Sequence, residues 1–317
     1  MENQEYKNKI DDLISEIKKV ITGQDELVRD LLITLFCRWH ILIEWVPGLA
    51  KTLTISTLSK ALDLDFSRVQ FTPDLLPSDL IWARVYTPET KEFYIKTWPI
   101  VSNFVLADEI NRAPSKVQSA LLEAMAERQV TIADKTIKLQ DPFIVLATQN
   151  PIEQDWTYSL PEAQLDRFLF KTIVSYPNQK EEIEIMKNNN LNNDAIQVKK
   201  ILWKKDIIKI QELIKETYVD ENIYEYIKDI VFYTRDLTNE VWKYLFYWAS
   251  PRASISLLHS AKAQAFLSGR DFVIPEDIKA VAKQVLRHRI ILNYEALAEN
   301  IQVDDLIETI LKRVKVK

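Results

Sequence analysis

The sequence predicts an α/β fold, in which a parallel-sheet core carries β-hairpin insertions and is followed by a smaller all-α domain. Two observations predict the core. A short apolar strand at 41–43 runs through a turn into a helix, and a second apolar strand at 103–107 ends in two acidic residues. The third observation is a change of character after Tyr176-Pro177-Asn178, where Lys, Glu and Asn become frequent at helical spacing. We therefore expect two domains, residues 1–176 and 177–317.

The elements follow from hydrophobic periodicity and turn residues, taken in chain order. In the first domain the predicted helices are 6–20, 25–37, 51–61 and 115–127, the strands are 41–43, 69–71, 103–107, 143–147 and 168–174, and the hairpins are 83–96 and 129–139. In the second, helices are predicted near 179–188, 204–216, 221–236, 251–268, 275–287 and 302–313, and no strand is expected. Pro251 and Pro275 stand at first-turn positions of two of these helices, where proline is favoured.

Composition narrows the class of protein. With 317 residues, 47% hydrophobic and 27% charged, the chain is typical of a globular protein of two domains. One cysteine and three scattered histidines predict neither an internal disulfide nor a His/Cys metal site, which favours a reducing, cytoplasmic setting. A polar start and charges within the most apolar region predict no signal peptide and no stable membrane insertion. The net charge of -5 gives no electrostatic footprint for nucleic acid, so no nucleic-acid partner is expected.

The turn after the first strand resembles a phosphate-binding loop. The pattern asks for Gly, four residues, Gly, Lys and Ser or Thr, because the backbone must curl until its amides point at phosphates. Trp45 and Ala50 occupy the two glycine positions, whereas Lys51 and Thr52 match the pattern. The ammonium can bridge phosphates and the hydroxyl can ligate Mg²⁺. The predicted nucleotide-binding residues here are Trp45, Val46, Pro47, Gly48, Leu49, Ala50, Lys51 and Thr52.

Five further residues could serve phosphoryl transfer. Asp108 can hold Mg²⁺ and the adjacent Glu109 can polarise an attacking water. Asn150, at the end of the strand that begins near 143, could orient that water. Arg167 and Arg252 are candidate cations for the developing charge, the first across a subunit interface and the second from the second domain. Taken singly, residues of these kinds are more often found in solvated loops, turns and surface ion pairs. The position of Asp108 and Glu109 about sixty residues after the phosphate-binding pattern favours function, whereas Asn150 and the two arginines need a longer pattern to support them.

That longer pattern is present from Gly23 to Val285, where the sequence resembles the MoxR family of AAA+ ATPases. The resemblance is carried by the segments 23–24, 46–49, 70–79, 106–114, 147–153, 160–168 and 250–254. It implies a Walker A motif at Lys51-Thr52, a Walker B motif at Asp108-Glu109, sensor 1 at Asn150, an arginine finger at Arg167, sensor 2 at Arg252 and nucleotide contacts at Gly23 and Gln24.

The resemblance also implies cofactors and partners. We expect ATP and Mg²⁺ as cofactors, bound between the subunits of a ring that is commonly a hexamer. The implied role is chaperone-like remodelling or maturation of protein clients, often with a partner that has a von Willebrand factor A domain. The two hairpins match family insertions that usually face the ring pore.

The chain is poor in glycine and rich in tryptophan. Average usage is about 7% glycine, yet there are 3 glycines and 8 tryptophans. Six tryptophans fall where the family usually has glycine, namely Trp39, Trp45, Trp82, Trp98, Trp156 and Trp248. Glycine is used where φ is positive or the backbone approaches a partner closely, so an indole there costs strain.

Our hypothesis is that these six positions are UGA codons that the source organism reads as glycine. The alternative is that they are genuine tryptophans in a diverged or inactive protein. UGG at positions 45, 82, 98 and 248 of the coding DNA would contradict the hypothesis. Ala50 is a separate departure, which at a cost of about 1 kcal/mol we expect to be tolerated.

The leading interpretation is an ATPase of the MoxR type that hydrolyses ATP at subunit interfaces. One alternative is a nucleotide-dependent scaffold without hydrolysis, in which a genuine Trp45 fills the phosphate pocket. Another is a nucleic-acid motor, which the acidic balance disfavours.

Overall fold

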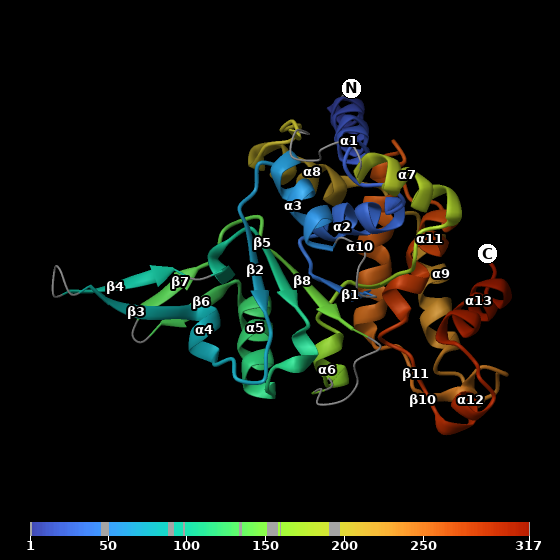
Figure 1. Ribbon diagram of the computed structural model, residues 1–317. Helices are drawn as coiled ribbons and strands as arrows, with labels where there is room; N and C mark the ends of the chain where they lie inside the picture. Colours follow the sequence, from blue (N-terminus) through green and yellow to red (C-terminus); the bar gives the residue numbers. More distant parts are fainter. Residues whose placement is uncertain are drawn as a thin grey trace.

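The chain folds around a five-stranded parallel sheet with the strand order β2-β5-β8-β1-β9 (Figure 1). The computed structural model describes residues 2–45, 51–87, 92–97, 99–132, 135–150, 158, 160–189 and 197–316. The sheet strands are β1 (Ile41–Trp45), β2 (Phe66–Gln70), β5 (Phe104–Asp108), β8 (Ile144–Gln149) and β9 (Phe170–Val174). All five predicted strands are therefore present, with β9 at one edge.

Helices cover both faces of the sheet, because its central strands are apolar on both sides. Every residue of β5 is buried, as expected of a central parallel strand. Along β1, Ile41 and Ile43 belong to one hydrophobic cluster and Leu42 to another, so the two clusters lie on opposite faces. The first cluster contains residues of α1 (Glu2–Lys18), α2 (Asp25–Phe36) and α3 (Lys51–Ala61). The second contains residues of α5 (Ser115–Glu127).

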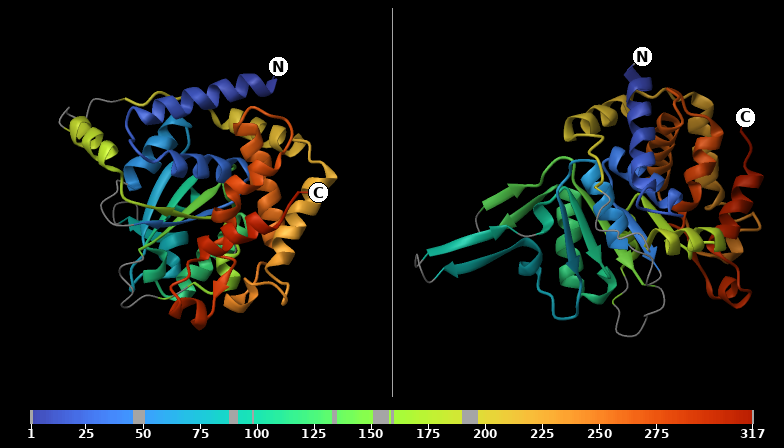
Figure 2. Two further views of the ribbon diagram at one scale, coloured as in Figure 1. Left: turned by 90° about the vertical axis from the view of Figure 1, so that its right-hand side faces the viewer. Right: turned by 45° about the horizontal axis from the view of Figure 1, so that its top comes forward.

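The C-terminal part of the chain is helical and packs against the side of the sheet where α1 and α2 lie (Figure 2). Its helices are α7 (Gln179–Asn189), α8 (Lys204–Glu216), α9 (Glu221–Tyr233), α10 (Pro251–Leu267), α11 (Pro275–Leu286), α12 (Tyr294–Ala298) and α13 (Val303–Arg313). Leu257 of α10 and Val281 of α11 belong to the same cluster as Ile43 of the sheet. These C-terminal helices, here called the lid, therefore share one continuous core with the face of the sheet that α1, α2 and α3 cover.

Two hairpins project from the sheet on the side away from the lid (Figure 1). They are formed by β3 (Trp82–Thr87) with β4 (Glu92–Thr97), and by β6 (Gln129–Ile132) with β7 (Lys135–Lys138). Both hairpins that the sequence predicted are therefore present. Two short helices, α4 (Pro77–Ile81) and α6 (Glu162–Leu165), complete the first half of the chain.

The structure corrects two expectations. Strand β2 begins at Phe66 rather than at 69, and it lies at the edge of the sheet, where polar residues are tolerated. The expectation of no strand after residue 176 was wrong, because β10 (Leu245–Tyr247) pairs with β11 (Ile291–Leu292). Strands of two or three residues are too short to show a period of two.

The described ranges lack two kinds of feature. None of their helices has the length and apolar character needed to cross a bilayer. Within the same ranges, no group of three or more His, Cys, Asp or Glu side chains is arranged to hold a metal ion.

Candidate functional site

The predicted Walker residues meet at the carboxyl edge of the sheet. Asp108 ends β5, Asn150 follows β8, and Lys51 begins α3, the helix that follows β1 in the chain. Parallel strands present their carboxyl ends at one edge, which is where α/β folds bind ligands. Lys51 Nζ lies 3.0 Å from Asp108 Oδ1, so the two residues are in direct contact.

The carboxylate of Asp108 is buried and held from three directions. Its side chain is 2% exposed, and Oδ1 accepts hydrogen bonds from Thr148 Oγ1 at 2.6 Å and from Lys51. Oδ2 accepts from Arg68 Nη2 at 2.6 Å and Nε at 3.1 Å. Burial alone would raise the pKa of Asp108, but the hydrogen bonds from Thr148, Arg68 and Lys51 outweigh it and hold that pKa below its usual range. The group is therefore an anion at neutral pH, as a ligand of a divalent cation must be.

Glu109 is separated from its neighbour by a strained turn of the backbone. Its φ of 57° lies in the left-handed region, which is uncommon for a residue other than glycine. Its amide donates to Thr148 Oγ1 at 2.9 Å. Its Oε2 accepts from Gln70 Nε2 and from Arg112 Nη1, each at 2.9 Å. Such strain is typical of functional sites, and here it turns the second carboxylate of the pair toward different partners from the first.

Three residues of this network were not singled out from the sequence. Arg68 and Gln70 lie on β2, and Thr148 lies on β8, which places them on the two strands that flank β5. Gln70 stands directly opposite Asp108 in the strand register. All three lie at or near the carboxyl ends of their strands, which is where a site is expected in a parallel sheet. This position indicates a role beside Asp108 only when the strand order is known.

Gly23 and Gln24 precede α2, and Gln24 contacts α3. The backbone of Gly23 has φ +77°, and a Cβ there would lie 2.8 Å from the Glu181 side chain, so this position requires glycine on conformational grounds. Gln24 Oε1 accepts a hydrogen bond from Thr54 Oγ1 of α3 at 2.7 Å. The predicted nucleotide contacts of this pair stay a prediction.

Trp45 is the last residue of β1 and is fully buried in the cluster that holds Ile41 and Ile43. Its indole N–H has no hydrogen-bond partner among the described residues. The idea that this ring fills the phosphate pocket finds no support in its position, because the side chain packs into the core. Val46, Pro47, Gly48, Leu49 and Ala50 lie outside the described residues, as do Trp98 and Trp156.

The backbone at the other tryptophans bears on why glycine would occur there. Among the described residues with positive φ there is no tryptophan, so Trp39, Trp45, Trp82 and Trp248 do not need glycine for a left-handed backbone. A close approach to the backbone is the reason that is left for glycine at these positions.

The two candidate arginines have partners outside the Walker network, which is the set of contacts around Asp108 and Glu109. Arg167 Nη1 donates to the carbonyl of Leu122 on α5 at 3.1 Å. Arg252 is exposed at the start of α10, and its Nη1 lies 3.6 Å from Asp166 Oδ2. No described hydrogen bond or ion pair joins either arginine to Lys51 or Asp108.

Comparisons with known proteins agree with this geometry. Residues 40–170 match the ATPase family associated with various cellular activities (AAA), and residues 243–310 match the AAA lid domain. The chain is 46% identical to Chaperone MoxR1 of Mycobacterium tuberculosis, covering 95% of this chain and 80% of the relative. It is 28% identical to Protein MoxR of Methylorubrum extorquens, covering 94% and 92%. The chain belongs to the MoxR family of AAA+ ATPases.

The crystal structure of a similar protein extends the agreement between this chain and known ATPases to the whole fold. A protein of Cytophaga hutchinsonii assigned as an ATPase superposes with a TM-score of 0.94 at 50% identity, covering 99% of this chain and 97% of that one. The predicted α/β core with a helical lid is thereby confirmed, and so is the prediction of an ATP hydrolase. This membership also disfavours the scaffold without hydrolysis.

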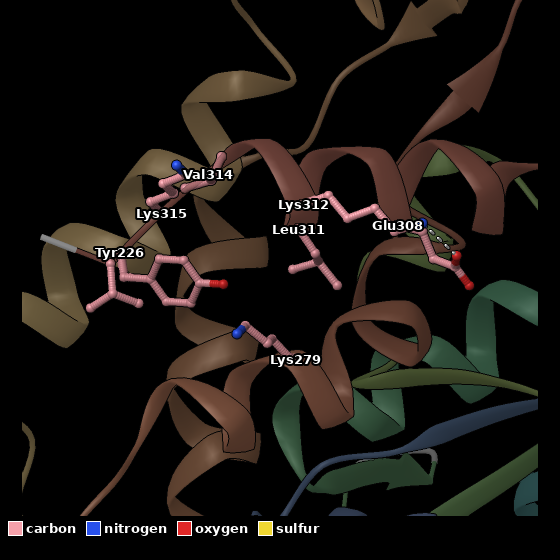
Figure 3. Close-up of a pocket in the computed structure, with 8 residues that line it drawn as sticks. Tyr226, Lys279, Glu308, Leu311, Lys312, Val314 and Lys315 are labelled. Carbon is pink, nitrogen blue, oxygen red and sulfur yellow. Dashed lines mark hydrogen bonds and ion pairs between the residues drawn. The ribbon is translucent and has the colours of Figure 1, made fainter.

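A separate cavity of about 520 Å³ lies on the lid of this MoxR-family chain, between α9, α11 and the end of α13 (Figure 3). Tyr226 points into it, and Lys279 and Lys312 line its wall. None of its lining residues is a predicted site residue. The cavity is therefore distinct from the Walker network, where the functional prediction rests.

Proposed function

We propose that this MoxR-family ATPase hydrolyses ATP at the interfaces of a ring, commonly a hexamer, and uses the energy to remodel or mature protein clients. The observation that carries the proposal is the convergence of Lys51, Arg68 and Thr148 on the buried carboxylate of Asp108, with Glu109 next to it. Two cationic side chains and one hydroxyl that donate to one carboxylate keep it ionised and fixed in place.

The donor set fits ATP with Mg²⁺. Helix α3 begins at Lys51, and the first amides of a helix have no partner within it, so phosphate oxygens could bind there with an ammonium and the Thr52 hydroxyl beside them. Lys51 would hold the phosphates, and Thr52 with Asp108 would hold Mg²⁺. When bound, Mg²⁺ neutralises charge on the transferred phosphoryl group. Residues 46–50, with Gly23 and Gln24, are proposed to complete the nucleotide contacts.

Glu109 is proposed to accept the proton of the attacking water. Gln70 and Arg112 hold its carboxylate in one direction, which fixes the geometry that general-base catalysis requires. Asn150 would orient the water from the next strand. Arg252 would stabilise charge from the lid of the same subunit, and Arg167 would do so from the neighbouring subunit.

The proposed partners follow from the family. A relative at 46% identity is named as a chaperone, which supports protein clients. A partner with a von Willebrand factor A domain is proposed on the same ground. Hairpins β3–β4 and β6–β7 project from the core, as elements that contact clients in a ring pore would. A cytoplasmic location and the absence of nucleic acid as a partner stay predictions.

The test of the proposed chemistry is Glu109→Gln. Glutamine keeps the hydrogen bond to Arg112 but cannot take up a proton, so we expect ATP binding to persist while turnover falls by about 100-fold or more. Glu123→Gln on the exposed side of α5 is the matched control and should retain turnover. Unchanged hydrolysis by Glu109→Gln would exclude this role for Glu109.

A further inference from the structure

The carboxylate of Asp166 is a contact point between the sheet domain and the lid. Asp166 follows α6, directly before Arg167. Its Oδ1 accepts from Arg289 Nε at 2.7 Å, and its Oδ2 accepts from Ser250 Oγ at 2.9 Å. Arg252 Nη1 lies 3.6 Å from the same Oδ2. Three lid residues thus converge on one carboxylate of the core.

Arg289 is buried at this contact with a complete set of partners. Arg289 follows the end of α11, and its side chain is 2% exposed. Besides Asp166, it donates to the carbonyls of Phe168 at 2.7 Å and Leu169 at 3.1 Å on the core side. On the lid side, the carbonyl of Val285 and the hydroxyl of Ser256 accept at 2.6 and 3.0 Å. These five partners match the five N–H groups of a guanidinium, so the side chain is fixed between the two domains.

The lid therefore holds the chain on both sides of Arg167. Arg289 binds the side chain of Asp166 and the backbone carbonyl of Phe168, which are the residues immediately before and after Arg167. His288 Nε2 also donates to the Phe168 carbonyl, at 3.0 Å. Arg167 cannot shift relative to the lid unless these contacts break.

Asp166 also connects this segment to the candidate sensor arginine. Ser250 caps α10 by accepting from the amide of Arg252, and its own hydroxyl donates to Asp166. Arg252 would contact bound nucleotide with the same exposed guanidinium that lies near Asp166. A movement of this guanidinium toward nucleotide would therefore draw it away from Asp166. The start of α10 and the segment around Arg167 are thus mechanically linked.

We propose that Asp166, held by Arg289, is a positioning residue through which nucleotide bound to one subunit sets the placement of the Arg167 that this subunit offers to its neighbour. This inference rests on the proposed ring, in which Arg167 acts in trans. It predicts that a defect at Asp166 impairs the neighbouring site and leaves the subunit's own nucleotide site intact.

The experiment is complementation between two impaired proteins. Asp166→Asn keeps the size of the side chain but loses its charge, so ATP affinity should be unchanged while turnover falls on the order of 10- to 100-fold. Glu109→Gln should bind ATP without hydrolysing it, so it keeps both bound nucleotide and an intact Arg167. In a mixture of equal amounts, about a quarter of interfaces join an Asp166→Asn nucleotide site to a Glu109→Gln neighbour, so turnover should recover toward about a quarter of the wild-type rate.

The control mixture combines Arg167→Ala with Glu109→Gln. Recovery in both mixtures supports the inference, whereas recovery in the control alone overturns it and leaves the proposed function standing. No recovery in the control means that Arg167 does not act in trans, and the proposed interface site fails with it. Loss of ATP binding by Asp166→Asn also overturns the inference, because the defect would then lie in its own subunit.

A second variant reports on the same contact with a different side chain changed. Arg289→Lys keeps a cation beside Asp166 but cannot reach the Phe168 carbonyl and Ser256 together. We expect an intermediate loss of turnover that the Glu109→Gln protein also complements. Wild-type turnover by Arg289→Lys would contradict the part assigned to Arg289.

Discussion

Asp30 is a fully buried carboxyl group outside the nucleotide site, and its ionisation should set how stability depends on pH. It lies on α2, where Oδ2 accepts from Thr172 Oγ1 of β9 at 2.8 Å and Oδ1 accepts from Arg29 Nη2 at 3.2 Å. Burial raises the pKa of Asp30 from 3.8 to about 6, although the charge of Arg29 and the Thr172 hydroxyl oppose the rise. The folded protein therefore binds a proton at Asp30 more tightly than the unfolded chain does.

The sign and size of the effect follow from this difference. A raised pKa in the folded state contributes stability that is complete below about pH 4 and is lost as the pH rises through about 6. A rise of about two pKa units corresponds to a change of about 3 kcal/mol in the free energy of unfolding. At neutral pH Asp30 is buried and ionised, so the free energy of unfolding of the wild-type protein should be lower by this amount than it would be with a protonated Asp30. This loss is the penalty of the buried charge.

Asp30→Asn should remove the penalty. The amide oxygen can still accept from Thr172, and Arg29 is exposed enough to turn to solvent. We expect Asp30→Asn to be more stable than wild type by about 3 kcal/mol near pH 7, with the difference vanishing near pH 4, as measured by urea unfolding at several pH values. Asp12→Asn, at an exposed position on α1, is the control and should show no difference that varies with pH. A less stable Asp30→Asn at neutral pH, or a difference that is constant with pH, would refute the reasoning.

Three further predictions concern the nucleotide site. Arg68→Ala removes two hydrogen bonds to Asp108 from a half-exposed partner, so we expect a loss of about 1–2 kcal/mol in urea unfolding and a shift of the acid limb of the ATPase profile to higher pH; an unshifted profile would contradict it. Gly23→Ala forces a side chain into the left-handed region and should cost about 1–2 kcal/mol in thermal unfolding, and no cost would show that the loop relaxes. Trp45→Gly should increase phosphate release if position 45 is glycine in the native protein, whereas a genuine tryptophan predicts a core cavity and a loss of about 3–5 kcal/mol.

Much of the fold was predictable because its helices are long and amphipathic or carry clear end signals. α3, α5 and α8 have the predicted bounds, since each combines periodic apolar residues with a clear start. β10 and β11 were missed because each depends on a partner strand more than forty residues away in the chain. The division at residue 176 stays a prediction, and the hydrophobic cluster shared by α2 and the lid shows that the two parts do not have separate cores.

The candidate site was predictable only in the parts that are local in sequence. Lys51 and the Asp108-Glu109 pair each follow a strand directly, and strand ends meet at one edge of a parallel sheet. Arg68 lies 40 residues from Asp108 and reaches it because β2 pairs with β5, which no local pattern reveals. The contact between Asp166 and Arg289 spans 123 residues and was beyond prediction for the same reason.

The end of β1 separates the two interpretations of the tryptophans on physical grounds. A buried indole N–H without a partner costs about 1–3 kcal/mol, which favours glycine at position 45. The same observation at Trp242, where the family gives no reason to expect glycine, shows that an unpaired indole is not specific evidence. The backbone at Trp39 and Trp248 is not left-handed, so glycine there would serve close packing instead of conformation. Trp248 is 48% exposed, three residues before the Pro251 that starts the Arg252 helix, so an indole could remain there without strain. Among Trp39, Trp45 and Trp248, the three of these tryptophans whose side chains the structure describes, the structural cost is concentrated at position 45, and that codon is the most informative of the three.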